Sequence, residues 1–192
     1  MRIGLLGGSF DPPHNGHLLI AGDVLEALGL DRVIWIPAGV QPLKGDQVRA
    51  APAQRMEMIR RLIADDPRFE LSAIEIERGG LSYTVDTLAA LADVWPAAEL
   101  FWLVGADVLE SFHKWKEPAR IVELASLVVV QRDTGETSPP PSVPAGPVLT
   151  VATRRIDISS TEIRRRVRDR KSIRGFVPDA VVDYIAAEGL YR

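Results

Sequence analysis

Short apolar segments alternate with amphipathic segments along most of the chain, and this alternation limits the possible fold more than any other feature of the sequence. Apolar or alternating runs of strand length occur at residues 3–6, 32–36, 69–76, 100–104, 127–130 and 148–152. Helical periodicity occurs at residues 18–28, 52–64, 84–94, 108–112, 119–124, 160–169 and 178–188. Strand–helix–strand units join parallel strands through right-handed crossovers. The sequence therefore predicts an α/β fold with a doubly wound, mostly parallel sheet and C-terminal helices.

The length and composition fit one domain over residues 1–192. Hydrophobic residues make up 46% of the 192 residues and charged residues 26%, enough for a normal core and a solvated surface. A polar loop is expected at residues 40–48. Residues 133–147 hold five of the 14 prolines, which indicates a loop or mobile flap rather than a linker between domains.

The segment that joins the first predicted strand to the first predicted helix carries two of the three histidines, His14 and His17. They lie in the run GGSFDPPHNGH, whose glycines would let a ligand approach the backbone at the carboxyl end of a parallel strand. The helix N-terminus that follows favours anions. At a spacing of i and i+3, both imidazoles project from the same side of the first helical turn. We therefore predict a phosphate site here.

A divalent metal ion is the alternative ligand for this loop, with Asp11, His14 and His17 as the candidate ligands. The chain has no H-E-x-x-H pattern and no cysteine, so nothing in it supports a dedicated zinc site. The lack of cysteine also excludes a disulfide framework and a thiol nucleophile. The phosphate interpretation is therefore preferred.

A second anion site is predicted in the segment ISSTEIR, near the end of the sequence. Ser159 as the N-cap and Glu162 three residues later form a capping box, which marks a helix start. Capping needs only one hydroxyl, so Ser160, Thr161 and Arg164 exceed that need. Free amides of the first helical turn and an arginine would bind a polyphosphate through charge-assisted hydrogen bonds.

The net charge of −3 argues against general affinity for nucleic acid, yet residues 154–174 carry a local charge of +6. Such a basic run is most often a solvated helix face. Here it also contains Arg164 and Arg168, either of which would contact a polyphosphate. The alternative is a nucleotide-binding or RNA-binding module, which would show steeply salt-dependent affinity for RNA and no turnover. We expect no nucleic acid partner.

No apolar stretch approaches the length of a membrane span, and Met1 leads directly into a predicted core strand without the charged region and cleavage site of a signal peptide. We therefore expect a cytoplasmic protein without a membrane partner.

The glycine patterns match neither the P-loop nor the G-x-G-x-x-G fingerprint. The run GGSFDPPHNGHL together with ISSTEIR instead resembles the nucleotidyltransferases that carry an H-x-G-H motif, most closely the bacterial nicotinate-nucleotide adenylyltransferases. Residues 82–88, 105–107 and 177–191 are similar to further blocks of that family, in the same order. Phosphopantetheine adenylyltransferases share the sheet but typically have threonine in place of His14. The resemblance implies a Rossmann-like nucleotidyltransferase fold.

This resemblance implies that AMP is transferred from ATP to nicotinate mononucleotide, giving nicotinate adenine dinucleotide and pyrophosphate, in NAD biosynthesis. The attacking phosphate oxygen is already ionised at neutral pH, so no protein nucleophile or general base is required. Catalysis would consist of positioning and of neutralising charge. Mg²⁺ should accompany ATP, bound through phosphates and water rather than by the protein. A homo-oligomer is a possible assembly, and nicotinamide mononucleotide or phosphopantetheine is the alternative acceptor.

Carried over residue by residue, the resemblance implies catalytic roles for His14 and His17 at the α and β phosphates of ATP. On the same basis, the remaining ATP and phosphate contacts would be Gly7, Gly8, Ser9 and Phe10 through their backbone, and Lys44, Ser159, Ser160, Thr161 and Arg164. Nicotinate mononucleotide would be bound by Thr84 at its carboxylate, Trp115 stacked on its ring, and Asp107 at nucleotide hydroxyls.

The chain departs from the family in the loop after the second predicted strand. The family commonly shows P-P-H-K there, whereas this chain has Gln41, Pro42, Leu43 and Lys44. An apolar leucine thus replaces the usual histidine. Lys44 stays available to the triphosphate, but a role for that histidine does not carry over, and the ATP contact would be rebuilt or partly open.

Overall fold

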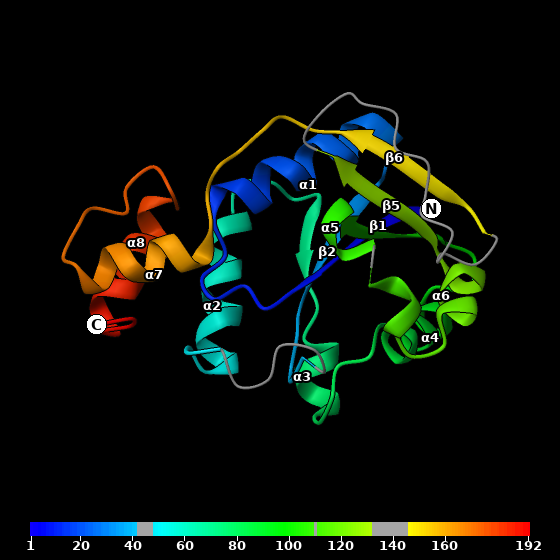
Figure 1. Ribbon diagram of the computed structural model, residues 1–192, viewed down its shortest axis with the longest axis horizontal. Helices are drawn as coiled ribbons and strands as arrows, with labels where there is room; N and C mark the ends of the chain where they lie inside the picture. The colour runs from blue at the N-terminus through cyan, green and yellow to red at the C-terminus, as the bar shows by residue number, and fades with distance from the viewer. Residues whose placement is uncertain (42–47, 110, 132–145) are drawn as a thin grey trace.

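Six strands form one sheet in the computed structural model, which describes residues 1–41, 48–109, 111–131 and 146–192, with the backbone alone at Asp107 (Figure 1). Their order is β3-β2-β1-β4-β5-β6 and every pairing is parallel. The strands are β1 (Arg2–Gly8), β2 (Arg32–Pro37), β3 (Phe69–Leu71), β4 (Glu99–Gly105), β5 (Ser126–Gln131) and β6 (Val148–Ala152). The strand order reverses between β1 and β4, which is where open α/β sheets bind ligands. The predicted doubly wound sheet is confirmed.

Helices cover both faces of this sheet (Figure 1). The helices of the first face are α1 (Asn15–Leu28), α2 (Pro52–Ile63), α7 (Ser160–Arg168) and α8 (Asp179–Ala187). Those of the second are α4 (Thr84–Val94), α5 (Ala106–Leu109), the 3-10 turn η1 (Phe112–Lys114) and α6 (Pro118–Leu124). A short helix, α3 (Ile74–Arg78), follows β3. Because α7 and α8 pack on the same side as α1, the second predicted anion site lies on the face that carries the first.

The strands are apolar on both faces, as expected for a sheet covered on both sides. In β2, Val33 and Trp35 pack in the core beneath α1 and α2, while Ile34 and Ile36 pack in the core beneath α4 and α6. Successive side chains of a strand point to opposite faces, so one run of apolar residues supplies both cores.

The prediction of a strand over residues 69–76 is correct only at its start. β3 ends at Leu71, which pairs with Trp35 of β2, and residues 74–78 form α3 instead. The alternating pattern is deceptive here because its phase changes between Ala73 and Ile74. Glu75 is 5% exposed and accepts a hydrogen bond from Thr87 Oγ1 at 2.7 Å. Burial of this carboxylate against α4 requires the helical turn.

Two predicted helices begin earlier than their apolar pattern indicates. α1 begins at Asn15 instead of residue 18, with His14 as its N-cap in extended conformation. The helix predicted at residues 108–112 divides into α5 and η1. The other predicted boundaries agree with the structure to within about two residues, the usual uncertainty of helix and strand ends.

No helix among the described residues is both long and apolar enough to cross a membrane. Most of the predicted loops at residues 40–48 and 133–147 lies outside the described residues, which leave out 42–47 and 132–145.

Candidate functional site

The two histidines of the H-x-G-H motif lie against each other at the carboxyl end of β1. His14 is the N-cap of α1 and His17 is the third residue of the helix. Their ring centroids are 3.6 Å apart and their planes are inclined by 23°, so the imidazoles are stacked. Gly16 makes this possible, because a Cβ at that position would lie 3.0 Å from His14 Nδ1. The expectation that both rings project from the same side of the first turn is confirmed.

Hydrogen bonding fixes which nitrogen of His17 carries the proton. The backbone N–H of His14 donates to His17 Nδ1 at 3.2 Å. Neutral imidazole has one donor and one acceptor nitrogen, so the proton of His17 lies on Nε2. The ring edge also contacts Phe10, with centroids 5.2 Å apart. His17 therefore presents an N–H donor from a fixed ring.

Burial makes both imidazoles hard to protonate in the absence of a ligand. Burial lowers the pKa of His14 from 6.5 to about 4. The pKa of His17 is lowered well below its usual value, first by burial and then by repulsion from His14. Among the described residues, His14 Nδ1 is buried and has no hydrogen-bond partner. Both rings are thus neutral at pH 7, and one has an unused polar atom.

We expect the free energy of unfolding to fall as the pH is lowered from 6.5 to about 4. In this range the unfolded chain binds a proton at His14 that the folded chain excludes, so protonation favours unfolding. The lowered pKa of His14 corresponds to on the order of 3 kcal/mol. Chemical denaturation at both ends of the range should show a smaller loss of stability in His14→Asn than in the wild type.

His113→Asn is the matched control, because His113 lies exposed in η1 and its replacement should leave the wild-type pH dependence in place. If His14→Asn lost as much stability as the wild type over this range, the burial argument for His14 would be wrong.

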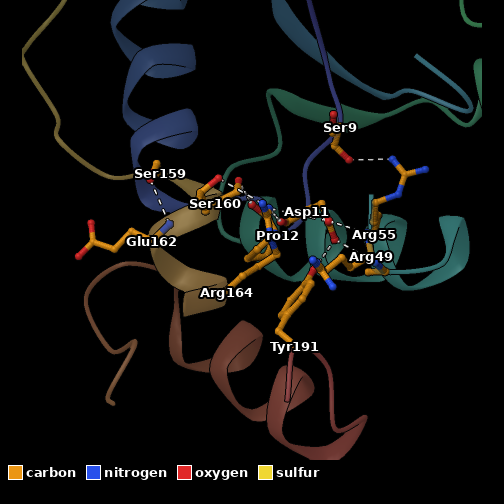
Figure 2. A network of polar contacts seen from close by, with 12 residues as sticks. Ser9, Asp11, Pro12, Arg49, Arg55, Ser159, Ser160, Glu162, Arg164 and Tyr191 are labelled. Atoms are coloured by element: carbon orange, nitrogen blue, oxygen red, sulfur yellow. Dashed lines mark hydrogen bonds and ion pairs between the residues drawn. The ribbon is translucent and has the colours of Figure 1, made fainter. Parts of the chain in front are cut away.

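The loop before α1 and the N-terminus of α7 contact each other directly, although the sequence separates them by 148 residues. Ser160 Oγ donates to the carbonyl of Pro12 at 2.8 Å, and Arg164 Nη1 donates to the carbonyl of Asp11 at 2.6 Å (Figure 2). The second guanidinium nitrogen of Arg164 donates to Thr161 Oγ1 at 3.1 Å. The two elements for which phosphate binding is predicted therefore lie in direct contact.

The hydroxyls at the start of α7 have separate tasks. Ser159 caps the helix, and its Oγ accepts from the backbone N–H of Glu162 at 3.2 Å (Figure 2). Ser160 joins α7 to the loop before α1, so its hydroxyl is not surplus as the sequence indicated. Thr161 is exposed beside the guanidinium of Arg164. Of the side chains in this turn, those of Thr161 and Arg164 are thus the best candidates to bind a ligand, since Ser159 and Ser160 have structural partners.

Residues 7–10, for which backbone contacts to ATP are predicted, also make packing contacts within the protein that explain their residue types. A Cβ on Gly7 would lie 2.8 Å from the ring of Trp102, so the glycine here allows the close approach of a core side chain. Phe10 is buried with a φ of 49°, and its ring packs against Trp35. Ser9 Oγ donates to Gln41 Oε1 at 3.0 Å. The side chain of Phe10 is therefore closed to a ligand.

The residues predicted for the second substrate come from neighbouring loops. Thr84 is the first residue of α4, whose N-cap, Tyr83, makes no side-chain capping bond. Trp115 directly follows η1, and next to it Lys116 Nζ donates to Asp86 Oδ1 at 2.8 Å and lies 5.0 Å from the ring centroid of Tyr83. The chain after η1 is thus held beside the start of α4.

The Trp115 side chain is partly buried, with its ring centroid 5.2 Å from that of Phe112. The backbone of Asp107 lies in α5, at the carboxyl end of β4 and thus next to β1 in the sheet. Lys44 and Leu43 lie outside the described residues.

The chain is similar to known proteins over its whole length. Residues 5–166 match the cytidylyltransferase-like family model. A probable nicotinate-nucleotide adenylyltransferase of Gemmatimonas aurantiaca is 51% identical, with 100% of this chain and 93% of the relative covered. One of Thermus thermophilus is 47% identical with both chains fully covered. The chain belongs to the nicotinate-nucleotide adenylyltransferase family.

Solved structures confirm the adenylyltransferase fold. The chain superimposes on the Plasmodium falciparum nicotinic acid mononucleotide adenylyltransferase complexed with NaAD, with a TM-score of 0.81 at 18% identity, covering 99% of this chain and 97% of the other. A Vibrio parahaemolyticus structure, described as a putative nicotinate-nucleotide adenylyltransferase, gives a TM-score of 0.70 at 22% identity, covering 100% and 95%. At these identities the likeness establishes the fold alone.

The structural roles of two charged residues beside the candidate site, Asp11 and Arg55, were not predicted from the sequence. Asp11, considered only as a metal ligand, is 3% exposed and accepts hydrogen bonds from the backbone N–H groups of Arg49 at 2.8 Å and Ala50 at 3.0 Å. Tyr191 donates its hydroxyl to the same carboxylate at 2.7 Å (Figure 2). Within the described part of the chain, no group of three or more acidic, His or Cys side chains is arranged to hold a metal ion.

Arg55 of α2 is the second missed residue. Its side chain is 1% exposed, and its two terminal nitrogens donate to the carbonyls of Ser9 and Ala38, each at 2.7 Å. These carbonyls follow β1 and β2, so one guanidinium fixes the spacing of two loops at the edge of the site. Burial lowers the pKa of Arg55, while Asp11 and Tyr191 act in the opposite direction. A basic residue on an amphipathic helix gives no sequence signal for such a role, because it usually faces water.

Proposed function

We propose that this chain transfers AMP from ATP to nicotinate mononucleotide, releasing pyrophosphate, with His14, His17 and the start of α7 holding the triphosphate. The contacts from Ser160 and Arg164 to the loop before α1 carry the proposal, because they bring two anion-binding helix N-termini to one sheet edge. The names of full-length relatives support nicotinate mononucleotide as the acceptor. Related structures complexed with NaAD and with APC support the two nucleotides as ligands.

The reaction needs no nucleophile or base from the protein. A phosphate oxygen of nicotinate mononucleotide forms a bond to the α-phosphorus of ATP, while the bond from that phosphorus to the oxygen bridging to the β-phosphorus breaks. Pyrophosphate leaves with the electron pair of the broken bond. The protein must align the two anions in line and neutralise the charge that grows on the leaving group.

The imidazoles are suited to this neutralisation. His17 presents Nε2–H toward an incoming phosphate, since its Nδ1 is occupied by the backbone N–H of His14. His14 offers a second ring, stacked on the first, with an unpartnered nitrogen among the described residues. A phosphate beside the rings favours their protonated form, which opposes the effect of burial. The pair therefore becomes a charged donor set when ATP is bound.

The start of α7 would hold the β and γ phosphates. Arg164 contacts the loop that carries the histidines and donates to Thr161, and the free amides of the first turn would bind phosphate oxygens beside them. Ser159 and Ser160 contribute through the geometry they impose on this turn, and Lys44 would add a cation from the loop after β2. Mg²⁺ would enter with ATP, held by phosphate oxygens and water, and would neutralise part of the triphosphate charge.

The other substrate would lie between α4, α5 and η1. Amides at the start of α4 around Thr84 suit the nicotinate carboxylate, because a helix N-terminus favours anions. Trp115 offers an aromatic face for the pyridine ring. Asp107 belongs to α5, which follows the strand next to β1, and would accept hydrogen bonds from ribose hydroxyls.

The function is tested by presenting the purified protein with Mg²⁺, ATP and one acceptor at a time, and measuring pyrophosphate release. We expect the highest kcat/KM with nicotinate mononucleotide, a lower value with nicotinamide mononucleotide, and no release with phosphopantetheine. A preference for either of the other acceptors would overturn the assigned substrate. If there were no release with any acceptor and steeply salt-dependent binding of RNA, the RNA-binding alternative would replace the proposal.

A further inference from the structure

Asp11 is a buried carboxylate that accepts hydrogen bonds from three neutral donors. The N–H groups of Arg49 and Ala50 donate to its two oxygens, and the hydroxyl of Tyr191 donates to Oδ1 at 2.7 Å. These donors come from the segment before α2 and from the segment after α8, so Asp11 joins both to the loop that leads to His14 (Figure 2). A buried anion is normally stabilised by a paired cation, and here neutral groups perform much of that task.

Arg164 lies beside this carboxylate without forming a hydrogen bond to it. Its Nη1 is 3.9 Å from Asp11 Oδ2, whereas the same nitrogen donates to the Asp11 backbone carbonyl at 2.6 Å. Arginine and carboxylate groups in contact commonly form two parallel hydrogen bonds. Such a pair is absent here, although among the described residues Oδ2 accepts only from the backbone N–H of Arg49, and the three donors stabilise the charge of the carboxylate without it. The guanidinium of Arg164 is therefore held by the backbone carbonyl of Asp11 and only weakly by its carboxylate.

Tyr191 is held in an unusual backbone conformation at this point. Its φ is +65°, in the left-handed region that L side chains rarely adopt. The ring packs against the core beneath α1 and α2, which directs the hydroxyl at Asp11. Burial, together with the carboxylate, raises the pKa of Tyr191, so the hydroxyl remains a proton donor. The phenol is thus a fixed, neutral partner for Asp11.

We propose that Tyr191 is a positioning residue for ATP, which keeps Arg164 available to the triphosphate by satisfying Asp11 in its place. Without the Tyr191 hydroxyl, Oδ1 of Asp11 loses a donor and Arg164 closes onto the carboxylate as a buried ion pair. ATP must then break that pair to recruit the guanidinium. This inference rests on the proposed function, in which Arg164 binds the β and γ phosphates.

Tyr191→Phe tests the inference, because it removes one oxygen and leaves the ring in the core. We expect the KM for ATP to rise roughly tenfold, the scale of one hydrogen bond to a charged group. The KM for nicotinate mononucleotide should stay within about twofold of the wild-type value. Tyr184→Phe is the matched control: Tyr184 lies in α8 with its ring over Arg61, away from Asp11, and its loss of a hydroxyl should change neither KM.

A double-mutant cycle separates this role from general support of the fold. In an Arg164→Gln background, Tyr191→Phe should not change the KM for ATP further. The guanidinium that the Tyr191 hydroxyl keeps available is already gone in that background. Affinity for α,β-methylene ATP, measured by calorimetry, provides a readout without turnover. Additive effects, equal increases in KM for both substrates, or wild-type affinity in Tyr191→Phe would each overturn the inference.

The two proposals fail in different ways. If the wild-type protein bound α,β-methylene ATP but released no pyrophosphate with nicotinate mononucleotide, the proposed function would fail. The calorimetric cycle between Tyr191 and Arg164 would still decide whether the hydroxyl sets the affinity of the triphosphate site.

Discussion

Replacement of His17 by alanine is expected to lower kcat by a factor on the order of 10² or more, the usual scale for one preorganised donor that stabilises transition-state charge. The ring is fixed by stacking on His14 and by the edge contact with Phe10, and its Nδ1 is occupied by a backbone donor. Nε2–H is therefore aimed outward before any ligand arrives. Steady-state pyrophosphate release with both substrates saturating gives the value of kcat.

Two further variants and one stability measurement serve as controls for this expectation. His113→Ala removes an exposed histidine from η1 and should retain wild-type turnover. His17→Gln keeps an uncharged N–H donor and should fall between the wild type and His17→Ala. Thermal unfolding of His17→Ala should confirm a folded protein, because the side chain is only partly buried. Turnover close to the wild-type value in His17→Ala would contradict the assignment of this residue to the reacting phosphates.

Substitution of Arg55 by methionine is expected to lower the free energy of unfolding by about 3 kcal/mol or more. The methionine would fill much of the same volume but would leave the carbonyls of Ser9 and Ala38 buried without their donor. It would also remove a positive charge that acts on Asp11 within the same interior. Urea denaturation followed by tryptophan fluorescence measures the difference.

Arg60→Met is the matched control for Arg55→Met. Arg60 lies in α2 as well, but it is exposed and paired with Glu57 at 3.5 Å, so its loss should change stability by no more than about 0.5 kcal/mol. Arg55→Lys should lie near the methionine variant, because one ammonium group lacks the fork that reaches both carbonyls. If Arg55→Met were as stable as Arg60→Met, the two carbonyl contacts would not hold the loops together.

The sequence predicted the sheet and the helix starts of α1 and α7 because their signals are local. Apolar runs and helical periodicity are visible within about ten residues, and the serines at the start of α7 mark a helix N-terminus by their spacing. The third strand was predicted too long because residues 69–76 alternate as a strand would. Its second half is α3, in which Glu75 accepts a hydrogen bond from Thr87 of α4.

Asp11, Arg55 and Tyr191 could not be predicted in their observed roles for the same reason. The hydrogen-bond partners of Asp11 lie far along the chain: Arg49 is 38 residues away, Ala50 is 39 and Tyr191 is 180. No periodic pattern links such positions. Their roles follow from the order of the strands and the return of α8 to the first loop, both of which are properties of the complete fold.

The contacts from Ser160 and Arg164 to the loop before α1 join distant segments of one folded chain. The chain entropy of bringing these distant segments together has therefore been lost during folding and is not subtracted again when a ligand arrives. ATP meets a clamp that is already assembled. Its binding free energy can go into aligning the α-phosphate, and pyrophosphate can depart without the clamp having to come apart.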